Sequence, residues 1–96
     1  MSIDAQGFDL DHPWRLDNQV AVRPEPFGGL LYHFGTRRLS FVKDTTALAV
    51  LQCMGEHPSA RSACRAVGVA DGALPAYEQA LASLAASKFI TRGPKP

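Results

Sequence analysis

The sequence predicts a small α+β domain in which a three-stranded antiparallel sheet is followed by a three-helix bundle. Two observations carry this prediction. Residues 19–42 consist of short β-prone runs separated by prolines and glycines, whereas from residue 44 onward the apolar residues recur at helical spacing. The chain has 96 residues, 46% hydrophobic and 20% charged, which is the range of one globular domain.

The three strands are expected between residues 19 and 42, with glycine-containing turns between them. A two-residue type II′ turn at Gly35 and Thr36 would place His33 opposite Arg38 and fix the register of the last two strands. One face of the sheet then collects large apolar side chains, and we expect that face to lie on the core. The opposite face is mostly polar and should meet solvent or a partner. The apolar face holds Leu30, Tyr32, Phe34, Leu39 and Phe41, and the polar face holds Leu31, His33, Arg38 and Ser40.

The three helices have recognisable starts and stops. Asp44 or Thr45 can serve as the N-cap of a first helix of about ten residues. Ser59 can cap a second, short helix, and Gly68 is a natural residue to end it. The third and longest helix is expected over residues 74–87, where leucines and a tyrosine recur at spacings of three and four.

Charge divides the chain into two parts. Residues 1–18 carry four aspartates against one arginine, a net charge of −3, whereas the remaining residues carry nine basic and five acidic side chains, a net charge of +4. We expect residues 1–18 to form an acidic arm that either stays disordered or orders on binding, and residues 19–93 to form the single domain. The overall charge of +1 provides no general attraction to nucleic acid or anionic membranes. Because neither a signal-peptide pattern nor an apolar run of about 18 residues is found, a cytoplasmic protein without a membrane partner is expected.

The sequence contains no motif for catalysis, nucleotide binding or metal binding. The patterns GxxxxGK[ST], HExxH and GxSxG are all missing. Cys53 and Cys64 lack CxxC spacing and have no histidine at zinc-ligand spacing, so we expect them to act as small buried apolar residues. A non-catalytic protein without cofactors is therefore predicted.

A winged-helix DNA-binding regulator is the alternative. The ending ALASLAASKFITR is similar to the third helix and wing start of winged helix-turn-helix proteins. A recognition helix needs cationic or amide side chains for phosphates and base edges. Residues 74–87 contain Glu78 and Gln79 but no arginine or lysine, so this helix would meet DNA with negative formal charge. We therefore expect no nucleic-acid partner.

The segment VRPEPFGGLLYHFGTRRLSFV, Val22 to Val42, followed by an alanine- and leucine-rich helix and the ending LASLAASKFITR, resembles the chaperones of mycofactocin biosynthesis, the MftB family. That family belongs to the PqqD-like group, also called RiPP recognition elements. The resemblance covers about residues 14–93. It implies a winged-helix-like fold that does not bind DNA, a ribosomally made precursor peptide whose leader region is the ligand, and a radical S-adenosylmethionine (radical SAM) maturase as partner enzyme. The most specific part consists of Arg23, Pro24, Glu25, Phe27, Gly28, Leu31, Tyr32, Leu39 and Phe41.

The residues themselves indicate how a peptide could bind. The third strand, residues 38–42, is the candidate sheet edge, because it leads directly into the helices and contains no proline. An edge strand offers unpaired N–H and C=O groups to an extended peptide, whose alternate side chains would enter a groove between this strand and the third helix. Nearby cations could attract an acidic leader, and core packing is the alternative role for the apolar members. The predicted peptide-binding residues are Arg38, Leu39, Ser40, Phe41, Val42, Lys43, Tyr77, Leu81 and Leu84.

The loop RPEPFGG is a second candidate site. Its plain interpretation is a rigid turn, because Pro24 and Pro26 stiffen the backbone while the glycines permit positive φ. The functional interpretation is an enzyme-docking face formed by Arg23, Glu25 and Phe27, since burying a projecting aromatic on a stiff loop costs little ordering entropy. The strand edge could also pair with a second copy of the chain, so both a monomer and a homodimer remain open.

Overall fold

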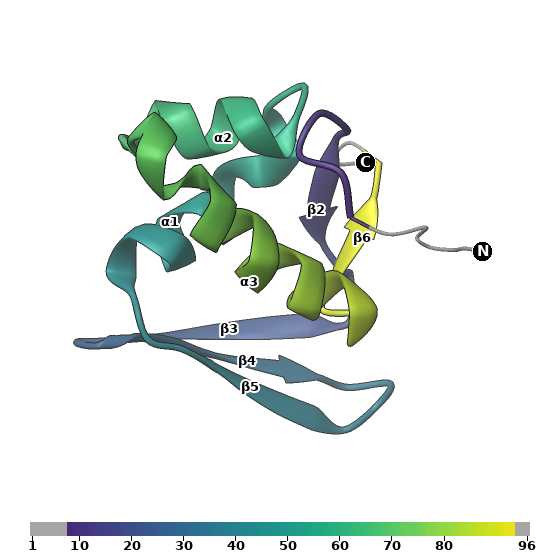
Figure 1. The fold of residues 1–96 in the computed structure, drawn as a ribbon. Coiled ribbons are helices and arrows are strands. Elements are labelled where there is room, and N and C mark those ends of the chain that lie inside the picture. The colour runs from purple at the N-terminus through teal and green to yellow at the C-terminus, as the bar shows by residue number, and fades with distance from the viewer. Residues whose placement is uncertain (1–7, 94–96) are drawn as a thin grey trace.

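The computed structural model describes residues 8–93, and its elements carry the labels of Figure 1. The strands are β2 (Trp14–Leu16), β3 (Val20–Glu25), β4 (Gly28–His33), β5 (Arg38–Val42) and β6 (Ile90–Arg92). The helices are α1 (Thr45–Cys53), α2 (Ala60–Val67) and α3 (Leu74–Ala86), joined by the short 3₁₀ turns η1 (Met54–Glu56) and η2 (Asp71–Ala73). Strands β3, β4 and β5 form an antiparallel sheet in that order, and the three helices follow it, so the predicted α+β class is confirmed.

The helices begin and end where their capping residues predict. The Asp44 carboxylate accepts a hydrogen bond from the backbone N–H of Thr46 at 2.9 Å and caps α1. The Ser59 hydroxyl oxygen likewise accepts from the N–H of Ser62 at 3.0 Å and caps α2, which ends at Gly68 with a φ of 101°. Each cap satisfies a backbone group that has no partner within the helix.

The predicted strand register is confirmed, although the predicted turn is wrong. His33 lies opposite Arg38, and the pairing continues to Gly29 opposite Val42. The connection is a four-residue turn over residues 34–37, in which Arg37 adopts a φ of 63° and donates its N–H to the His33 carbonyl at 2.7 Å. The positive φ falls on Arg37 rather than on Gly35, so this is not a type II′ turn. The register is unchanged because the predicted two-residue turn and the observed four-residue turn both place His33 opposite Arg38.

The prediction of which sheet face lies on the core is also wrong. Figure 1 shows the helices covering one face of the β3-β4-β5 sheet and leaving the other open. The covered face presents Leu31, which is fully buried, together with His33 and Val42, which are 4% and 8% exposed. The large apolar side chains predicted for the core lie on the open face instead. Among them Phe34, Leu39 and Phe41 are 59%, 60% and 61% exposed.

Two local features explain this inversion. Gly29 leaves space for α1, because a Cβ atom there would stand 3.0 Å from the methyl groups of Leu48. His33 is buried because its ring Nδ1 accepts hydrogen bonds from the N–H groups of Gly35 and Thr36, at 3.0 and 3.1 Å. A buried polar group is tolerated when it is hydrogen-bonded in this way. The number of apolar residues on each face therefore does not decide which face of this sheet packs on the core.

A second sheet, missed in the sequence, joins the two ends of the described chain. Strands β2 and β6 pair antiparallel, with Trp14 opposite Arg92 (Figure 1). Leu10 and Trp14 are each only 4% exposed, and the Trp14 indole N–H donates to the Asp9 carbonyl at 2.9 Å. Residues 8–18 therefore pack onto the domain. The rest of the predicted arm, residues 1–7, lies outside the described residues, and the boundary at residue 18 stays a prediction.

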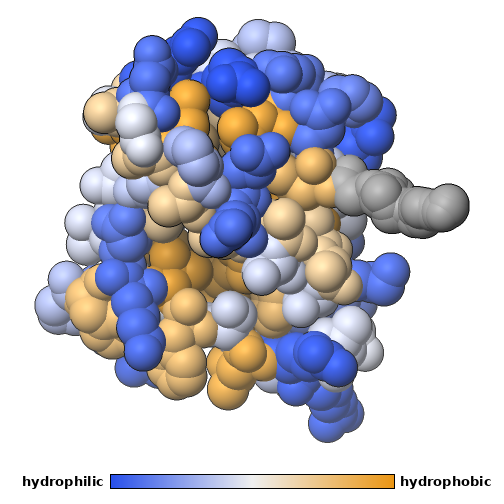
Figure 2. Space-filling model, in the orientation of Figure 1, coloured by the Kyte–Doolittle hydropathy of each residue, from blue (hydrophilic) through white to orange (hydrophobic). Residues whose placement is uncertain are grey.

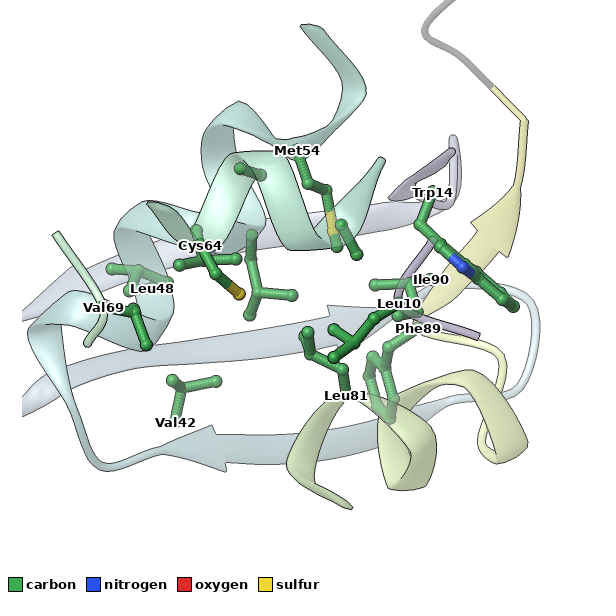
Figure 3. Packing of buried hydrophobic residues seen from close by; sticks show 14 of the residues in the cluster. Leu10, Trp14, Val42, Leu48, Met54, Cys64, Val69, Leu81, Phe89 and Ile90 are labelled. Carbon is green, nitrogen blue, oxygen red and sulfur yellow. The ribbon is translucent and has the colours of Figure 1, made fainter. Parts of the chain in front are cut away.

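The core lies between the covered sheet face, the three helices and β6 (Figure 3). Its largest fully buried side chains come from β4, α1, η1, α2 and β6, so every layer contributes to one cluster. Cys64 is buried in this cluster as a small apolar residue, and Cys53 is half-buried. The largest fully buried members are Leu31, Val50, Leu51, Met54, Cys64 and Ile90.

Candidate functional site: a groove beside strand β5

A groove of about 410 Å³ runs between strand β5 and helix α3. Figure 2 shows it as a hollow with apolar surface inside it and along the adjoining sheet edge. Its floor and walls come from β5, α1 and α3. The lining residues are Ser40, Phe41, Val42, Lys43, Asp44, Ala47, Leu51, Ala76, Tyr77, Ala80, Leu81, Ser83 and Leu84.

Strand β5 is an edge of the sheet, and two backbone hydrogen bonds near its start show which of its residues point toward β4. Phe34 donates its N–H to Gln19 beside β3, whereas the His33 carbonyl accepts from Arg37 beside β5. Backbone groups of successive strand residues point to opposite sides, so alternate residues of β4 bond to β5, and their partners in β5 include Ser40. The N–H and C=O groups of Leu39 and Phe41 therefore point to the open edge, into the space beside the groove.

Helix α3 forms the opposite wall with a few large and several small side chains. Leu81 is 3% exposed and anchors the helix in the core, while Leu84 is half-buried against that core. Ala76, Ala80 and Ser83 line the groove between them and are exposed. These small side chains leave the space that larger residues would fill, because they recur at spacings that keep them on one side of the helix.

Tyr77 and Asp44 close one end of the groove. The Tyr77 hydroxyl donates a hydrogen bond to the Asp44 carboxylate at 2.6 Å, which ties α3 to the start of α1. This hydrogen bond, helped by desolvation and by the negative charge of Asp44, raises the pKa of Tyr77 to about 12. The phenol therefore stays protonated at physiological pH and remains a donor to the carboxylate.

Most of the predicted peptide-binding residues surround this one groove. Leu81 and Val42 also belong to the buried core, so for them the core-packing role holds together with a place in the wall. Arg38 lies exposed at the start of β5 and Leu39 on the open sheet face, and neither lines the groove. The predicted residues that do line it are Ser40, Phe41, Val42, Lys43, Tyr77, Leu81 and Leu84.

The predicted site residues did not include the small residues of the α3 wall, although the alanines of this helix, Ala80 among them, indicate a surface that another backbone can approach closely, and they did not include the contributions of α1. Ala76, Ala80 and Ser83 carried a usable signal, because a helix face that combines leucines with small residues favours close approach of another backbone. Ala47 and Leu51 had no such signal. They form an ordinary helical stripe, and only the position of α1 under β5 brings them to the groove.

Of the three predicted docking residues, Arg23 and Glu25 lie in the last part of β3 and Phe27 lies in the turn to β4. Arg23 and Glu25 form an ion pair with 2.8 Å between Nε and Oε2, and the Arg23 side chain remains largely exposed. Phe27 is 47% exposed and projects from the turn. The next residue must be glycine, because Gly28 has a φ of 149° and a Cβ there would collide with the Val42 carbonyl oxygen. The turn is thus held against the end of β5.

The described residues contain no group of three or more His, Cys, Asp or Glu side chains placed to hold a metal ion. Within the same part of the chain, no helix is long and apolar enough to cross a membrane. The groove offers backbone hydrogen-bonding groups, apolar walls and a phenol held by a carboxylate. Such a surface can hold an extended chain, since it combines an open strand edge with pockets for alternate side chains.

The fold and the groove define a class of protein, a small α+β module with an open strand edge beside a helix, consistent with the PqqD-like arrangement. A sequence model of the Peptide chaperone MftB family matches residues 13–91, and the chain belongs to this family. The resemblance seen in the sequence is therefore confirmed. Peptide chaperones have a non-catalytic role, which agrees with the expectation that the chain is not an enzyme.

Three relatives share the name Peptide chaperone MftB. The chain is 58% identical to the protein of Mycobacterium ulcerans (strain Agy99) over 86 residues, 90% of this chain and 79% of the relative. It is 56% identical to that of Mycobacterium tuberculosis (strain ATCC 25618 / H37Rv), over 91% of this chain and 80% of the relative. For the protein of Mycolicibacterium smegmatis (strain ATCC 700084 / mc(2)155) the identity is 55%, over 90% and 84% of the two chains. No solved structure matches the chain.

Proposed function

We propose that this chain binds the leader region of a ribosomally made precursor peptide and presents it to a radical SAM maturase in mycofactocin biosynthesis. The peptide adds as a further strand to the edge of β5. The observation that carries this proposal is the coincidence of an open strand edge with an apolar groove on the same side of the sheet. Membership of a peptide chaperone family supports the same role.

The geometry of an added strand sets the chemistry of the ligand. Peptide residues that pair with the backbone of Leu39 and Phe41 would project on the open sheet face, and the residues between them would enter the groove. The groove walls are apolar, so the inward peptide residues should be apolar and of medium size. Lys43 at the end of β5 and the exposed Arg38 at its start would favour acidic residues in the peptide.

The proposed partner enzyme would dock through Arg23, Glu25 and Phe27. Phe27 supplies an exposed aromatic side chain, and the Arg23–Glu25 ion pair borders it with charge. Iron–sulfur clusters and S-adenosylmethionine would belong to that enzyme. A cytoplasmic location is part of the proposal, and the two free cysteines fit a reducing compartment. No structural observation favours the DNA-binding alternative, because α3 carries no arginine or lysine.

Two pairs of variants test strand addition by calorimetric titration with a synthetic leader peptide of the precursor encoded beside this chain. Leu39→Pro removes an N–H from the open edge, whereas Leu39→Ala keeps it, so we expect the proline variant to bind about tenfold more weakly than the alanine variant. Proline is tolerated at an edge position whose N–H points away from the sheet. Ser40 is unsuitable for this test, because its N–H is directed toward β4.

The second pair tests the groove. Ala80→Leu should fill it and weaken peptide binding at least about tenfold, since an overfilled pocket excludes the inward side chains. Ala86→Leu is the matched control, because Ala86 is likewise an exposed alanine of α3 but does not line the groove. Equal peptide affinity within both pairs, in folded proteins, would exclude binding at this edge.

A further inference from the structure

The face of the β3-β4-β5 sheet that the helices leave open carries an apolar patch, and the side chains of this patch are not part of the core. We define the outer sheet face by five side chains that cross-strand pairing and ring contact place together. Leu30 lies opposite Phe41 and Tyr32 opposite Leu39, and the ring of Phe34 meets that of Tyr32 edge-on at 5.3 Å between centroids. Side chains of directly opposed strand residues share a face. The outer sheet face therefore consists of Leu30, Tyr32, Phe34, Leu39 and Phe41.

The exposure of this face is large for a structural surface. Phe34, Leu39 and Phe41 keep 59%, 60% and 61% of their surface exposed. With about 150–200 Å² for each fully exposed side chain, they present about 300 Å² of apolar surface, the lower end of the range for the largest patch of a soluble monomer, and such patches are often functional. Burying it in the core is impossible, because the helices already occupy the other face (Figure 1).

Charge argues that the occupant is a different protein rather than a second copy. The sheet segment, residues 19–43, contains four cations and one carboxylate, and that carboxylate is paired with Arg23. Arg37 and Arg38 lie at one end of β5 and Lys43 at the other. Two copies placed face to face would bring these cations together in either orientation, which costs energy. A partner with an apolar centre and a rim of carboxylates complements the face.

Area argues that this partner also contacts the bound peptide. A stable interface buries about 800 Å² on each side, which is more than twice the patch on the chain alone. A peptide strand added to β5 would lie about 4.8 Å from it and would carry its own outward side chains beside Leu39 and Phe41. The outward side chains of the peptide would thus extend the outer sheet face by one more strand.

We infer that the enzyme that modifies the bound peptide docks on the outer sheet face, in addition to the contact proposed above at Arg23, Glu25 and Phe27, and that it recognises the chaperone and the peptide together. The inference rests on the proposed function, because the second half of the surface is the peptide. Binding of the peptide then strengthens binding of the enzyme, and by thermodynamic linkage the enzyme strengthens binding of the peptide by the same factor.

The test measures the Kd of the purified radical SAM maturase of the same genome for the wild-type chain, without peptide and with saturating leader peptide. We expect the peptide to lower this Kd at least about tenfold. Phe34→Ser and Tyr32→Thr should raise the Kd of the enzyme about tenfold while leaving peptide affinity unchanged, since neither residue lies on β5 or lines the groove. Ala66→Ser, at an exposed position of α2 away from the sheet, is the control and should change neither affinity.

The outcomes separate the two proposals. A wild-type chain that binds no leader peptide contradicts the proposed function. A chain that binds the peptide, yet whose enzyme affinity is unaffected by Phe34→Ser and Tyr32→Thr, overturns the inference alone. The same holds if these variants instead abolish a dimer seen by sedimentation or flotation with anionic phosphatidylglycerol vesicles. If either variant fails to fold, Phe34→Leu and Tyr32→Leu replace the pair, with a smaller loss expected in the same direction because each removes an aromatic ring but keeps an apolar side chain.

Discussion

Asp44 links the start of a helix to the end of the groove. One carboxylate oxygen accepts from the backbone N–H of Thr46 at 2.9 Å, and the other accepts from the Tyr77 hydroxyl at 2.6 Å. The first contact caps α1 and the second holds α3 at a fixed distance from β5. Because the groove exists only while α3 stands away from the strand, this one residue contributes to both the fold and the site.

Tyr77→Phe tests the Tyr77–Asp44 contact through the pH dependence of stability. At pH 7 we expect the variant to lose about 1 kcal/mol of unfolding free energy, the usual value of one hydrogen bond. The pKa of Tyr77 is raised from 10.0 to about 12, so the phenol keeps its proton more tightly in the folded state. Its contribution is therefore complete below about pH 10 and is lost as pH rises toward 12.

The measurement is a series of urea unfolding curves for wild type and variant from pH 7 to 11.5. The difference between the two proteins should be constant up to about pH 10 and should then shrink. Tyr32→Phe, on the outer sheet face, is the matched control and corrects for the other groups that titrate in this range. If the difference in unfolding free energy stays constant over the whole pH range, the Tyr77 hydroxyl does not stabilise the fold by donating its proton to Asp44.

His33 shows why single residues limit prediction from sequence. Its polarity placed it on the solvent face, yet it is 4% exposed because it accepts from two N–H groups of its own turn. Its other ring nitrogen lies 3.7 Å from the Asp17 carboxylate, and its ring meets that of Phe89 edge-on. These partners come from distant parts of the chain, so no local pattern announces them.

At the scale of elements, local signals predicted well and distant pairing did not. The caps of α1 and α2, the extent of α3 and the register of β4 with β5 are all set by residues close together in sequence. Strands β2 and β6 contain three residues each and join opposite ends of the described chain. Their pairing has no periodic signal, because three residues do not establish an alternation.

The groove was predictable in part for the same reason. Its two main walls, β5 and α3, were recognised from edge and helix signals, and both line it. The position of Leu39 was missed, because the choice of sheet face depends on how Gly29 admits Leu48 of α1. Because the helices cover the other face, Leu39 lies on the outer sheet face and not in the groove where it was expected.

Trp14→Ala tests whether the β2–β6 sheet is a structural part of the domain. Trp14 is 4% exposed, packs against the Phe8 ring at 4.8 Å between centroids and donates a hydrogen bond to Asp9. Removing a buried tryptophan leaves a cavity, so we expect a loss of about 3–5 kcal/mol. Circular dichroism should follow the unfolding, because Trp14 is the sole tryptophan of the chain.

Trp14→Phe is the matched control and should lose less, since it keeps one aromatic ring in the core and leaves a smaller cavity. A loss below about 1 kcal/mol for Trp14→Ala would mean that residues 8–18 are dispensable to the fold. That result would favour the expected acidic arm over residues 1–18, which stays disordered or orders on binding.

In the whole molecule, one small sheet provides two candidate binding surfaces, the β5 edge beside the groove and the outer sheet face. The covered face is used for the core, the β5 edge is open beside the groove, and the outer sheet face remains free for a partner. A domain of this size has little stability to spare, so a ligand that adds a strand should alter the stability of the entire unit. The same edge could accept a second copy of the chain, in which case peptide and copy would compete for it.

Thermal unfolding measures this effect on the whole molecule. A ligand present at a hundredfold excess over its Kd stabilises the folded state by about 2.7 kcal/mol. A single domain of this length gains about 4–8 °C in Tm for each kcal/mol, so the leader peptide should raise Tm by about 10–20 °C. The same concentration of a scrambled peptide should cause no increase. Ala80→Leu should lose most of the increase while Ala86→Leu retains it, because only Ala80 lines the groove. An equal increase in both variants would mean that the peptide stabilises the domain from a different surface.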